Sequence, residues 1–586
     1  MEGIEGIERN RGPSSPELHL AGSVSRNGGV EVHGASSMLH NDPTYRLNRH
    51  RSPFTSASEK EDYNKNSQAR LVAFSSQQNQ TEAMLRRNPD ELSHIDFDGV
   101  DPALALHLIG AHFNRQHFTF MITYRTAIMD SLINGGPYCN KILLNAIYLS
   151  SSVYSGRKEL RLDPADREST GERFLRRLRI LFSEYIDTPS IPTATGLLLS
   201  GAILVSMGQM SAGWVHTGIA YRMIIDLGCH LAVEMKVADT STKSALQADI
   251  DLEIRKRLYW GAFLTDATQS LYFGRPQTLM PAQARVSRKL LDTHEELEMW
   301  LPYQDPSGQS WTQNDSSYAP RPAYAISTFN GMVGLFEISS RIVASFYSMQ
   351  SLNISSSDVR QLKSSIELDL EQWFVELPDI LKLDLDSEAT FAPHQMTLLT
   401  TYHTFQILLR RPYTTNGHLS KSFSLDEQRT AEHASIDAAL AIYSLVTKYR
   451  SAFGLERAPY LISYSIYSAI VVILNQKSLP RDQFKECMRF YWTALGDLRK
   501  GSNFGLQKPM EILKESVLQF TEDLPDLADG WDGEGLDNVP GCFDAGDGSG
   551  NACARRRNDF LGTTMTGEST FDDVLFGLFI NDLAPF

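Results

Sequence analysis

The sequence predicts an all-α protein, in which a large multi-helix domain lies between disordered N- and C-terminal segments. Apolar residues recur at three- and four-residue steps through most of residues 100–520, as in amphipathic helices. Strand-like alternation bounded by turn pairs is almost absent. The chain is 42% hydrophobic and 21% charged, a balance typical of globular proteins with a buried core.

Composition divides the 586 residues into three regions. Residues 1–94 are rich in Ser, Asn, Gly, Arg and Gln, and such a segment buries too little apolar surface to offset its ordering entropy. We therefore predict disorder there, a helical domain at 95–520 and an acidic tail at 521–586. Asp101 is expected to cap the first helix, with Pro102 in its first position.

Within the large domain the helices follow in order. Residues 104–133 are long enough for two helices, and Thr193 is expected to cap a helix that runs to about Gly208. Residues 277–322, rich in Pro, Ser, Gln and Asn, are predicted to be an internal loop or a domain boundary. Further helices are expected at 141–153, 173–185, 323–349, 359–377, 393–409, 424–449, 459–474, 482–498 and 509–520.

The sequence predicts a packed helix in the segment GWVHTGIAYRMIIDLGCH (residues 213–230). Trp214, Gly218, Tyr221 and Ile225 are predicted to form one apolar stripe. Gly213, Gly218 and Ala220 are small, so we expect a neighbouring helix to approach closely here. Gly218 costs about 1 kcal/mol against Ala inside a helix, which indicates a packing role for it. A left-handed cap is expected at Gly228. Arg222 and Asp226 are four residues apart and can pair on the helix surface, where an exposed pair is worth less than about 1 kcal/mol.

A second helix is predicted in EIRKRLYWGAFLTDATQSLYFGRP (residues 253–276). Glu253 and Arg257 form an acid-first pair four residues apart, and Trp260 extends the apolar face. Asp266 falls inside this helix and, if buried, needs a cationic partner. The candidates are Arg275 and the basic residues 255–257. The helix is expected to stop at the run Gly274, Arg275 and Pro276.

Together with TYHTFQILLRRPY (residues 401–413), these segments resemble the fungal-specific transcription factor domain. This is the middle homology region of zinc binuclear-cluster regulators such as the xylanolytic activators, and the resemblance covers roughly residues 100–415. It implies an all-α regulatory domain, a nuclear location, and activity restrained or released by metabolites. Many members of the family regulate carbon use or secondary-metabolite gene clusters.

The cysteines depart from the family pattern. The family carries six cysteines in a short N-terminal stretch, where they bind two zinc ions and contact DNA. Here five cysteines stand at positions 139, 229, 487, 542 and 553, with no C-x-x-C pair. We therefore expect no zinc cofactor and no DNA binding by this chain alone. The net charge of −15 also indicates no basic surface of the kind that binds nucleic acid. Either the DNA reader is missing or its exon lies upstream of Met1.

Other patterns do not indicate an enzyme. His107, His112 and His117 are spaced by five, so successive members lie about 140° apart on a helix, and we interpret them as structural. Asp572 and Asp573 have no second acidic cluster, and nucleophile-elbow, Walker A and Rossmann patterns are absent. We predict no catalytic, cofactor-binding or metal-binding residues, no signal peptide and no membrane helix.

The tail is strongly acidic, with 14 Asp and Glu against 3 Arg in residues 521–586. Phe571, Val574, Leu575, Leu578 and Phe579 follow the spacing i, i+3, i+4, i+7, i+8, which predicts an acidic amphipathic helix. We expect it to bind the transcription machinery or a co-activator. The alternative is that it packs on the protein's own core.

The sequence thus favours a fungal transcription regulator of metabolic or secondary-metabolite genes, not an enzyme. Two alternatives remain: a helical enzyme of secondary metabolism with an unrecognised site, and a co-regulator that dimerises with a DNA-binding partner. Homo- and heterodimers are both compatible with the sequence, and the effector and the target genes are not encoded in any recognisable motif.

Overall fold

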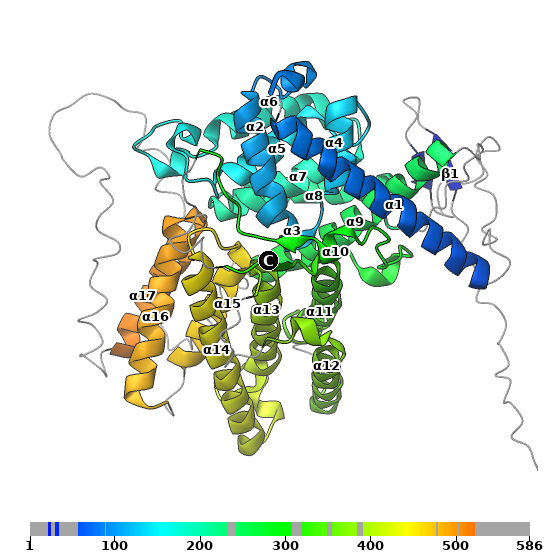
Figure 1. Ribbon diagram of the computed structural model, residues 1–586. Helices are drawn as coiled ribbons and strands as arrows, with labels where there is room; N and C mark the ends of the chain where they lie inside the picture. The colour runs from blue at the N-terminus through cyan, green and yellow to red at the C-terminus, as the bar shows by residue number, and fades with distance from the viewer. Residues whose placement is uncertain are drawn as a thin grey trace, which may run out of the picture.

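The computed structural model describes residues 21–24, 30–33, 57–87, 89–231, 242–307, 318–348, 354–383, 391–475, 479–501 and 503–521. These residues are overwhelmingly helical (Figure 1), which confirms the predicted all-α class. The helices are α1 (Ala57–Arg87), α2 (Pro102–Ala111), α3 (His117–Phe120), α4 (Arg125–Asn134), α5 (Lys141–Ser152), α6 (Glu172–Tyr185), α7 (Ile191–Ser206), α8 (Met210–Asp226), α9 (Thr242–Phe273), α10 (His294–Leu297), α11 (Ala325–Phe346), α12 (Ser356–Glu376), α13 (Pro393–Arg410), α14 (Leu425–Phe453), α15 (Tyr460–Leu474), α16 (Arg481–Lys500) and α17 (Gln507–Thr521).

Strands are few and short in the described residues. β1 (Ala21–Val24) pairs antiparallel with β2 (Val30–His33), with Ala21 opposite His33. β3 (Met299–Trp300) pairs with β4 (Arg321–Pro322) in a second two-stranded ladder. Neither ladder contributes a layer to the fold, which is built from helices packed on helices.

The helices form two groups, one above the other in Figure 1. In the upper group, α7 packs between α5 and α8, and α2 packs on α5. In the lower group, α13 packs on α14, α15 and α11, and α16 lies against α15. The long helix α9 and the short helices α3 and α10 lie where the groups meet. None of the described helices combines the length and the apolar content needed to cross a bilayer.

Side-chain caps explain several helix starts. The Asp101 carboxylate accepts hydrogen bonds from the backbone N–H of Ala103 and Leu104, and Pro102 begins the helix, as predicted. For α7 the predicted cap is wrong. Ser190, not Thr193, is the cap, and its hydroxyl accepts the Thr193 N–H at 3.3 Å. The helix starts earlier because Pro192 fits its first turn rather than the preceding loop.

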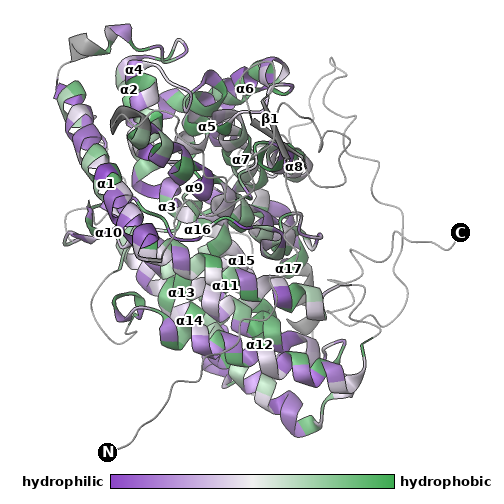
Figure 2. Cartoon of the chain, turned by 90° about the vertical axis from the view of Figure 1, so that its right-hand side faces the viewer, coloured by the Kyte–Doolittle hydropathy of each residue, from purple (hydrophilic) through white to green (hydrophobic). Residues whose placement is uncertain are grey.

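Helix α1 corrects the predicted disorder of residues 1–94. Residues 57–87 form one helix, and a 3-10 turn follows at Pro89–His94. Figure 2 shows the helix as largely hydrophilic along its length. Leu71 and Leu85 are buried, but the other anchors are polar contacts to distant residues, which hydrophobic periodicity does not reveal. The predicted disorder of the remaining N-terminal residues and of the tail falls outside the described residues.

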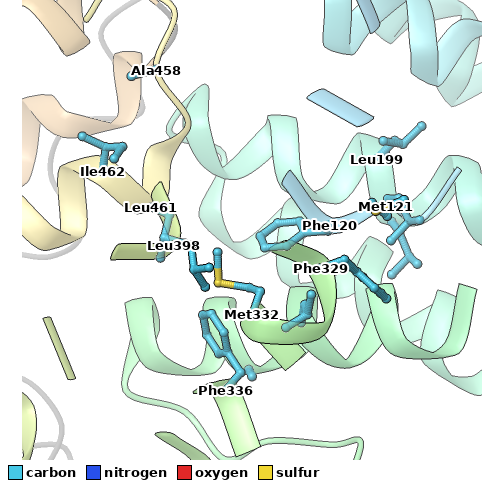
Figure 3. Close-up of a cluster of buried hydrophobic side chains, with 14 of the residues drawn as sticks. Phe120, Met121, Leu199, Phe329, Met332, Phe336, Leu398, Ala458, Leu461 and Ile462 are labelled. Atoms are coloured by element: carbon cyan, nitrogen blue, oxygen red, sulfur yellow. The ribbon is translucent and has the colours of Figure 1, made fainter. Parts of the chain in front are cut away.

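A single apolar cluster joins the upper and lower groups. It runs from Leu71 on α1 to Leu513 on α17. Figure 3 shows where it crosses the junction: Phe120 ends α3, Phe329 and Met332 lie on α11, and Leu398 lies on α13. Because the core is continuous, the described residues of this stretch, 277–307 and 318–322, do not separate two cores, which favours the alternative of an internal loop.

That loop contains what we call the crossing segment, residues 279–307, which connects the two groups. Its Leu290, Leu291 and Trp300 are buried. The Trp300 indole N–H donates to the Asn114 carbonyl at 2.9 Å, next to α3. The same ring stacks edge-on against Phe453 of α14, in the lower group. The crossing segment is therefore part of the core despite its polar composition.

Candidate functional site

A buried group of charged and polar side chains lies between α9, α3, α4 and the crossing segment. We call it the central ion network, and its members are His117, Tyr124, Glu253, Arg257, Asp292 and Glu295. Arg257 is 0% exposed. Its Nη1 donates to Glu295 Oε2 at 2.6 Å, its Nε to Glu253 Oε1 at 3.4 Å, and its Nη2 to the Asp292 carbonyl at 3.2 Å. One guanidinium thus joins α9 to the crossing segment.

The acidic side chains of the network have further partners. Glu253 Oε2 accepts the Leu291 N–H at 2.9 Å, and Oε1 accepts the Asp292 N–H at 3.2 Å. Asp292 Oδ2 accepts the Tyr124 hydroxyl at 2.7 Å and the hydroxyl of Ser75 on α1. The network therefore also ties α1 and α4 to the crossing segment.

Burial and charge shift the two glutamates in opposite directions. Burial by itself would raise the pKa of Glu295, but the charges of Arg257 and His117 outweigh it and hold that pKa well below its usual range. Burial raises the pKa of Glu253, and the attraction of Arg257 only partly offsets this. Arg257 therefore acts mainly as the counter-ion of Glu295.

All three histidines hydrogen-bond to side chains of the fold, and the spacing of two of them has a local explanation. His112–Gln116 is a π-helical turn in which the His117 N–H bonds to the His112 carbonyl, so the two residues lie one turn apart. Both rings reach Thr123 Oγ1, at 3.2 and 2.8 Å. His107 instead contacts Ser155 Oγ at 3.0 Å. In the described ranges no group of three or more His, Cys, Asp and Glu side chains is placed to hold a metal ion.

Beside the network lies a pocket of about 150 Å³. Its lining comes from α1, α2, the π-helical turn, α3, α4, the crossing segment and Ala323. Its charged residues are Arg86, Arg125 and Glu298, and its rings are Phe113, Phe118, Trp300 and Tyr303. A second hollow, between Arg411 and Asn475, measures about 30 Å³, roughly the room for one water molecule. The first is the better candidate for a ligand site.

Arg125 connects the pocket to α1 and to the crossing segment. Its Nε and Nη2 donate to Glu82 at 3.3 and 2.9 Å, while its Nη1 lies 3.5 Å from Glu298 Oε1. Glu298 also accepts from Asn79 at 3.5 Å. The contacts of Glu298 are thus long, whereas those of Glu82 are at normal hydrogen-bond distance.

The signature helix α8 packs differently from the prediction. Its buried face consists of Gly213, Thr217, Ala220, Tyr221, Met223 and Ile224. Of the predicted stripe, Tyr221 is buried, Trp214 and Gly218 are half-buried, and Ile225 is exposed. The predicted stripe therefore lies on the wrong face of α8. Trp214 is half-buried and Ile225 is exposed, although both side chains are large and apolar. Arg222 and Asp226 lie exposed at the surface, and the ion pair between them stays a prediction.

The close helix approach occurs at Gly201 and at Gly213, one of the three small residues expected to permit it, and not at Gly218. A Cβ built on Gly213 would lie 2.7 Å from the Gly201 carbonyl oxygen, whereas one built on Gly218 meets nothing within 4 Å. The predicted packing role of Gly218 is therefore wrong. The left-handed cap at Gly228 is confirmed, with φ of +69° and its N–H bonded to the Ile225 carbonyl.

The signature part of α9 is buried on all sides. The Glu253–Arg257 pair is present, but it is internal rather than solvated. Trp260 is buried, and its Nε1–H donates to the Ser287 carbonyl at 3.2 Å. Gly274, with φ of +62°, follows the last helical residue, and Arg275 and Pro276 leave the helix, as predicted.

Asp266 does not use the cation expected for it. Its Oδ2 accepts the backbone N–H groups of Thr278 and Leu279, at 2.7 and 2.6 Å. Arg275 instead stacks over the Trp214 ring, 5.1 Å from its centroid. Two backbone donors satisfy the carboxylate without a counter-ion, and burial raises the pKa of Asp266 to about 6.

Sequence reasoning missed most of the site. Asp292, Glu295, Glu298 and Arg125 lie in segments without strong periodicity, and the available signal was only the concentration of acids in residues 292–298. The predicted tail helix, with Phe571, Val574, Leu575, Leu578 and Phe579, lies outside the described residues.

Comparison with known proteins places this site within one family. Residues 109–375 match the family described as the fungal specific transcription factor domain. The chain carries a fungal specific transcription factor domain. This domain begins in α2, ends in α12, and contains the central ion network, both signature helices and the pocket lining other than Arg86.

Curated relatives of the domain are fungal regulators. The sequence is 25% identical over 391 residues to the nitrogen assimilation transcription factor nirA of Emericella nidulans, covering 65% of this chain and 42% of nirA. It is 26% identical over 398 residues to the nitrogen assimilation transcription factor nit-4 of Neurospora crassa, covering 65% and 34%. An uncharacterized transcriptional regulatory protein of Schizosaccharomyces pombe is 24% identical over 393 residues, covering 66% and 59%. The match spans less than two thirds of each relative.

Proposed function

We propose that the protein regulates transcription in a fungal nucleus, controls metabolic or secondary-metabolite genes, and responds to a small effector through its fungal specific transcription factor domain. The observation that carries the proposal is the family match over residues 109–375. The relatives named above are transcriptional regulators, which supports the same class of function.

The crossing segment suggests how the domain responds. Glu295 pairs with Arg257 of α9, and Glu298 faces Arg125 of α4. Glu296 accepts the N–H groups of Ile326 and Ser327 at the start of α11, at 2.9 and 3.0 Å. A ligand that binds two positions of this segment with different affinity therefore shifts α11 relative to α4 and α9.

Two features suggest the partners: the acidic tail, and the lack of a zinc-cluster cysteine pattern in this sequence. We propose that residues 571–579 bind the transcription machinery or a co-activator. A DNA-binding partner chain is proposed to supply the DNA contact in a heterodimer, with a homodimer as the alternative form. This chain by itself is proposed to hold no zinc or other cofactor.

A tethering experiment tests the function. The full chain is fused to a foreign DNA-binding domain, and transcription of a reporter with the matching site is measured. We expect a several-fold change in reporter output, because tethering brings the chain to the reporter without any DNA contact of its own. A reporter that is indifferent to the tethered, normally expressed chain contradicts the proposal and favours the co-regulator or enzyme alternatives.

The same fusion tests the tail. Replacing Leu575 and Phe579 by Ala removes part of the apolar face and is expected to abolish most of the reporter response. The matched control changes Thr563 and Thr564 to Ala, in the same tail but outside that face. Equal responses from the two double variants contradict the role of the tail.

A further inference from the structure

The pocket beside the central ion network has the size of a small metabolite. Its volume is about 150 Å³, and an engineered cavity of about that volume holds benzene. This limits a fully enclosed ligand to roughly ten non-hydrogen atoms.

The pocket presents a cationic group and an anionic group that are both incompletely paired. Arg86 is an exposed residue at the end of α1. No salt bridge joins it to another described residue, and its Nη2 lies 3.0 Å from the position of a Cβ built on Gly110. Glu298 holds its partners only through Oε1, at 3.5 Å, and its Oε2 accepts no hydrogen bond from the described residues. Burial raises the pKa of Glu298 despite the nearby Arg125.

The remaining walls are apolar. The polar atoms of the aromatic residues are engaged elsewhere: Trp300 donates to the Asn114 carbonyl, and Tyr303 donates to the His107 carbonyl at 3.2 Å. The Phe118 ring is held by stacking on His394, at a centroid distance of 4.7 Å. The ring faces therefore remain for an apolar group of the ligand.

The backbone around the pocket has features that often accompany ligand sites. The π-helical turn His112–Gln116 supplies Phe113 and Asn114 to the lining. Met121, just after α3, and Tyr324, just after the lining residue Ala323, have φ of +46° and +47°. Such conformations are unfavourable for residues other than glycine and concentrate at ligand clamps and switches.

We propose that this pocket binds a free α-amino acid with an apolar side chain of leucine or methionine size. Arg86 takes the carboxylate, Glu298 takes the ammonium group, and the rings of Phe113, Phe118 and Trp300 pack on the side chain. A zwitterion pairs both groups without adding net charge. A ligand bound in this way bridges α1 to the crossing segment. The inference rests on the proposed function in one respect: the amino acid would be the small effector to which the regulator responds.

Titration calorimetry on the purified full chain tests the ligand class. The probes are L-leucine and L-methionine, with 4-methylpentanoate, which lacks the ammonium group, and 3-methylbutylamine, which lacks the carboxylate. We expect one of the two amino acids to bind at least about tenfold more tightly than either analogue, because each analogue leaves one charged group of the pocket unpaired. Absence of amino-acid binding, or equal binding of an analogue, overturns the proposal.

Pocket variants assign the two ends of the ligand. Glu298→Gln is expected to weaken amino-acid binding about tenfold and to leave 4-methylpentanoate unchanged, while Arg86→Gln weakens both. Arg87→Gln is the matched control, because Arg87 is exposed on the same helix and does not line the pocket. If Glu298→Gln and Arg86→Gln bind the amino acid as tightly as Arg87→Gln does, the assignment is overturned. Thermal melts followed by circular dichroism check that each variant is folded.

The binding result is independent of the reporter result. Amino-acid binding by a chain that does not affect the tethered reporter contradicts the proposed function and leaves the pocket assignment standing. A chain that drives the reporter but binds neither amino acid contradicts the pocket assignment only.

Discussion

At the scale of single residues, Asp266 illustrates how burial without a counter-ion changes stability. The pKa of Asp266 rises to about 6 because it is buried, so the folded state binds a proton more readily than the unfolded state does. Its contribution to stability is therefore present at low pH and declines as pH rises from about 4 to about 6, by on the order of 2 kcal/mol.

The variant Asp266→Asn tests this effect. Because Asn does not titrate, the stability of the variant relative to the parent is expected to rise between pH 4 and pH 6, as measured by urea unfolding at each pH. Asp98→Asn is the opposite control, because Arg177 holds the pKa of Asp98 at about 2. The stability that Asp98 adds is lost only as pH falls below about 4. If the difference in unfolding free energy between Asp266→Asn and the parent did not change with pH, the pKa of Asp266 would not be raised.

At the scale of elements, the contact between α7 and α8 depends on Gly201 and Gly213. A methyl group on Gly213 would lie 2.8 Å from Val205 Cγ2 as well as against the Gly201 carbonyl. Gly213→Ala is therefore expected to destabilise the fold by about 1–3 kcal/mol. Gly218→Ala, five residues along the same helix, is expected to stabilise it by up to about 1 kcal/mol, since Ala favours the helix.

Chemical denaturation of the two variants measures the difference. The pair controls for helix propensity, because both substitutions replace glycine by alanine within α8. If Gly218→Ala is the more destabilising of the two, the assigned contact face of α8 is wrong.

How well each helix was predicted depended on whether the residues that stabilise it lie near it in the sequence. Most helices between residues 100 and 520 were predicted within a few residues, because apolar periodicity, Asp101 and Gly228 act within about one turn. The exception is α9, which begins at Thr242 rather than near Glu253. Helix α1 was missed because its anchors include Arg70 to Asp249 and Ser75 to Asp292, which are 179 and 217 residues apart.

At the scale of the whole molecule, Arg257 connects the upper helices to the crossing segment. Its removal in Arg257→Met leaves the buried carboxylate of Glu253 without its cation and leaves Glu295 with His117 as its remaining partner. Breaking a buried pair in this way is expected to destabilise the protein by about 3–5 kcal/mol, seen as a lower midpoint in thermal or urea unfolding.

Arg222→Met provides the control for this change. Arg222 is an exposed residue of α8, and surface substitutions of that kind usually alter stability by less than about 0.5 kcal/mol. Equal midpoints for the two variants would mean that the central ion network does not hold the crossing segment.

The sequence by itself determined the all-α class, most helix limits, and the family signature, because helix formation and capping depend on residues within about four positions of one another. Only the tertiary structure decided which charges are buried, which glycines touch, and where a pocket forms. His117 meets Glu295 across 178 residues, and the pocket is assembled from α1, α4 and the crossing segment. Such contacts depend on how separate helices pack, and no local pattern in the chain encodes that packing.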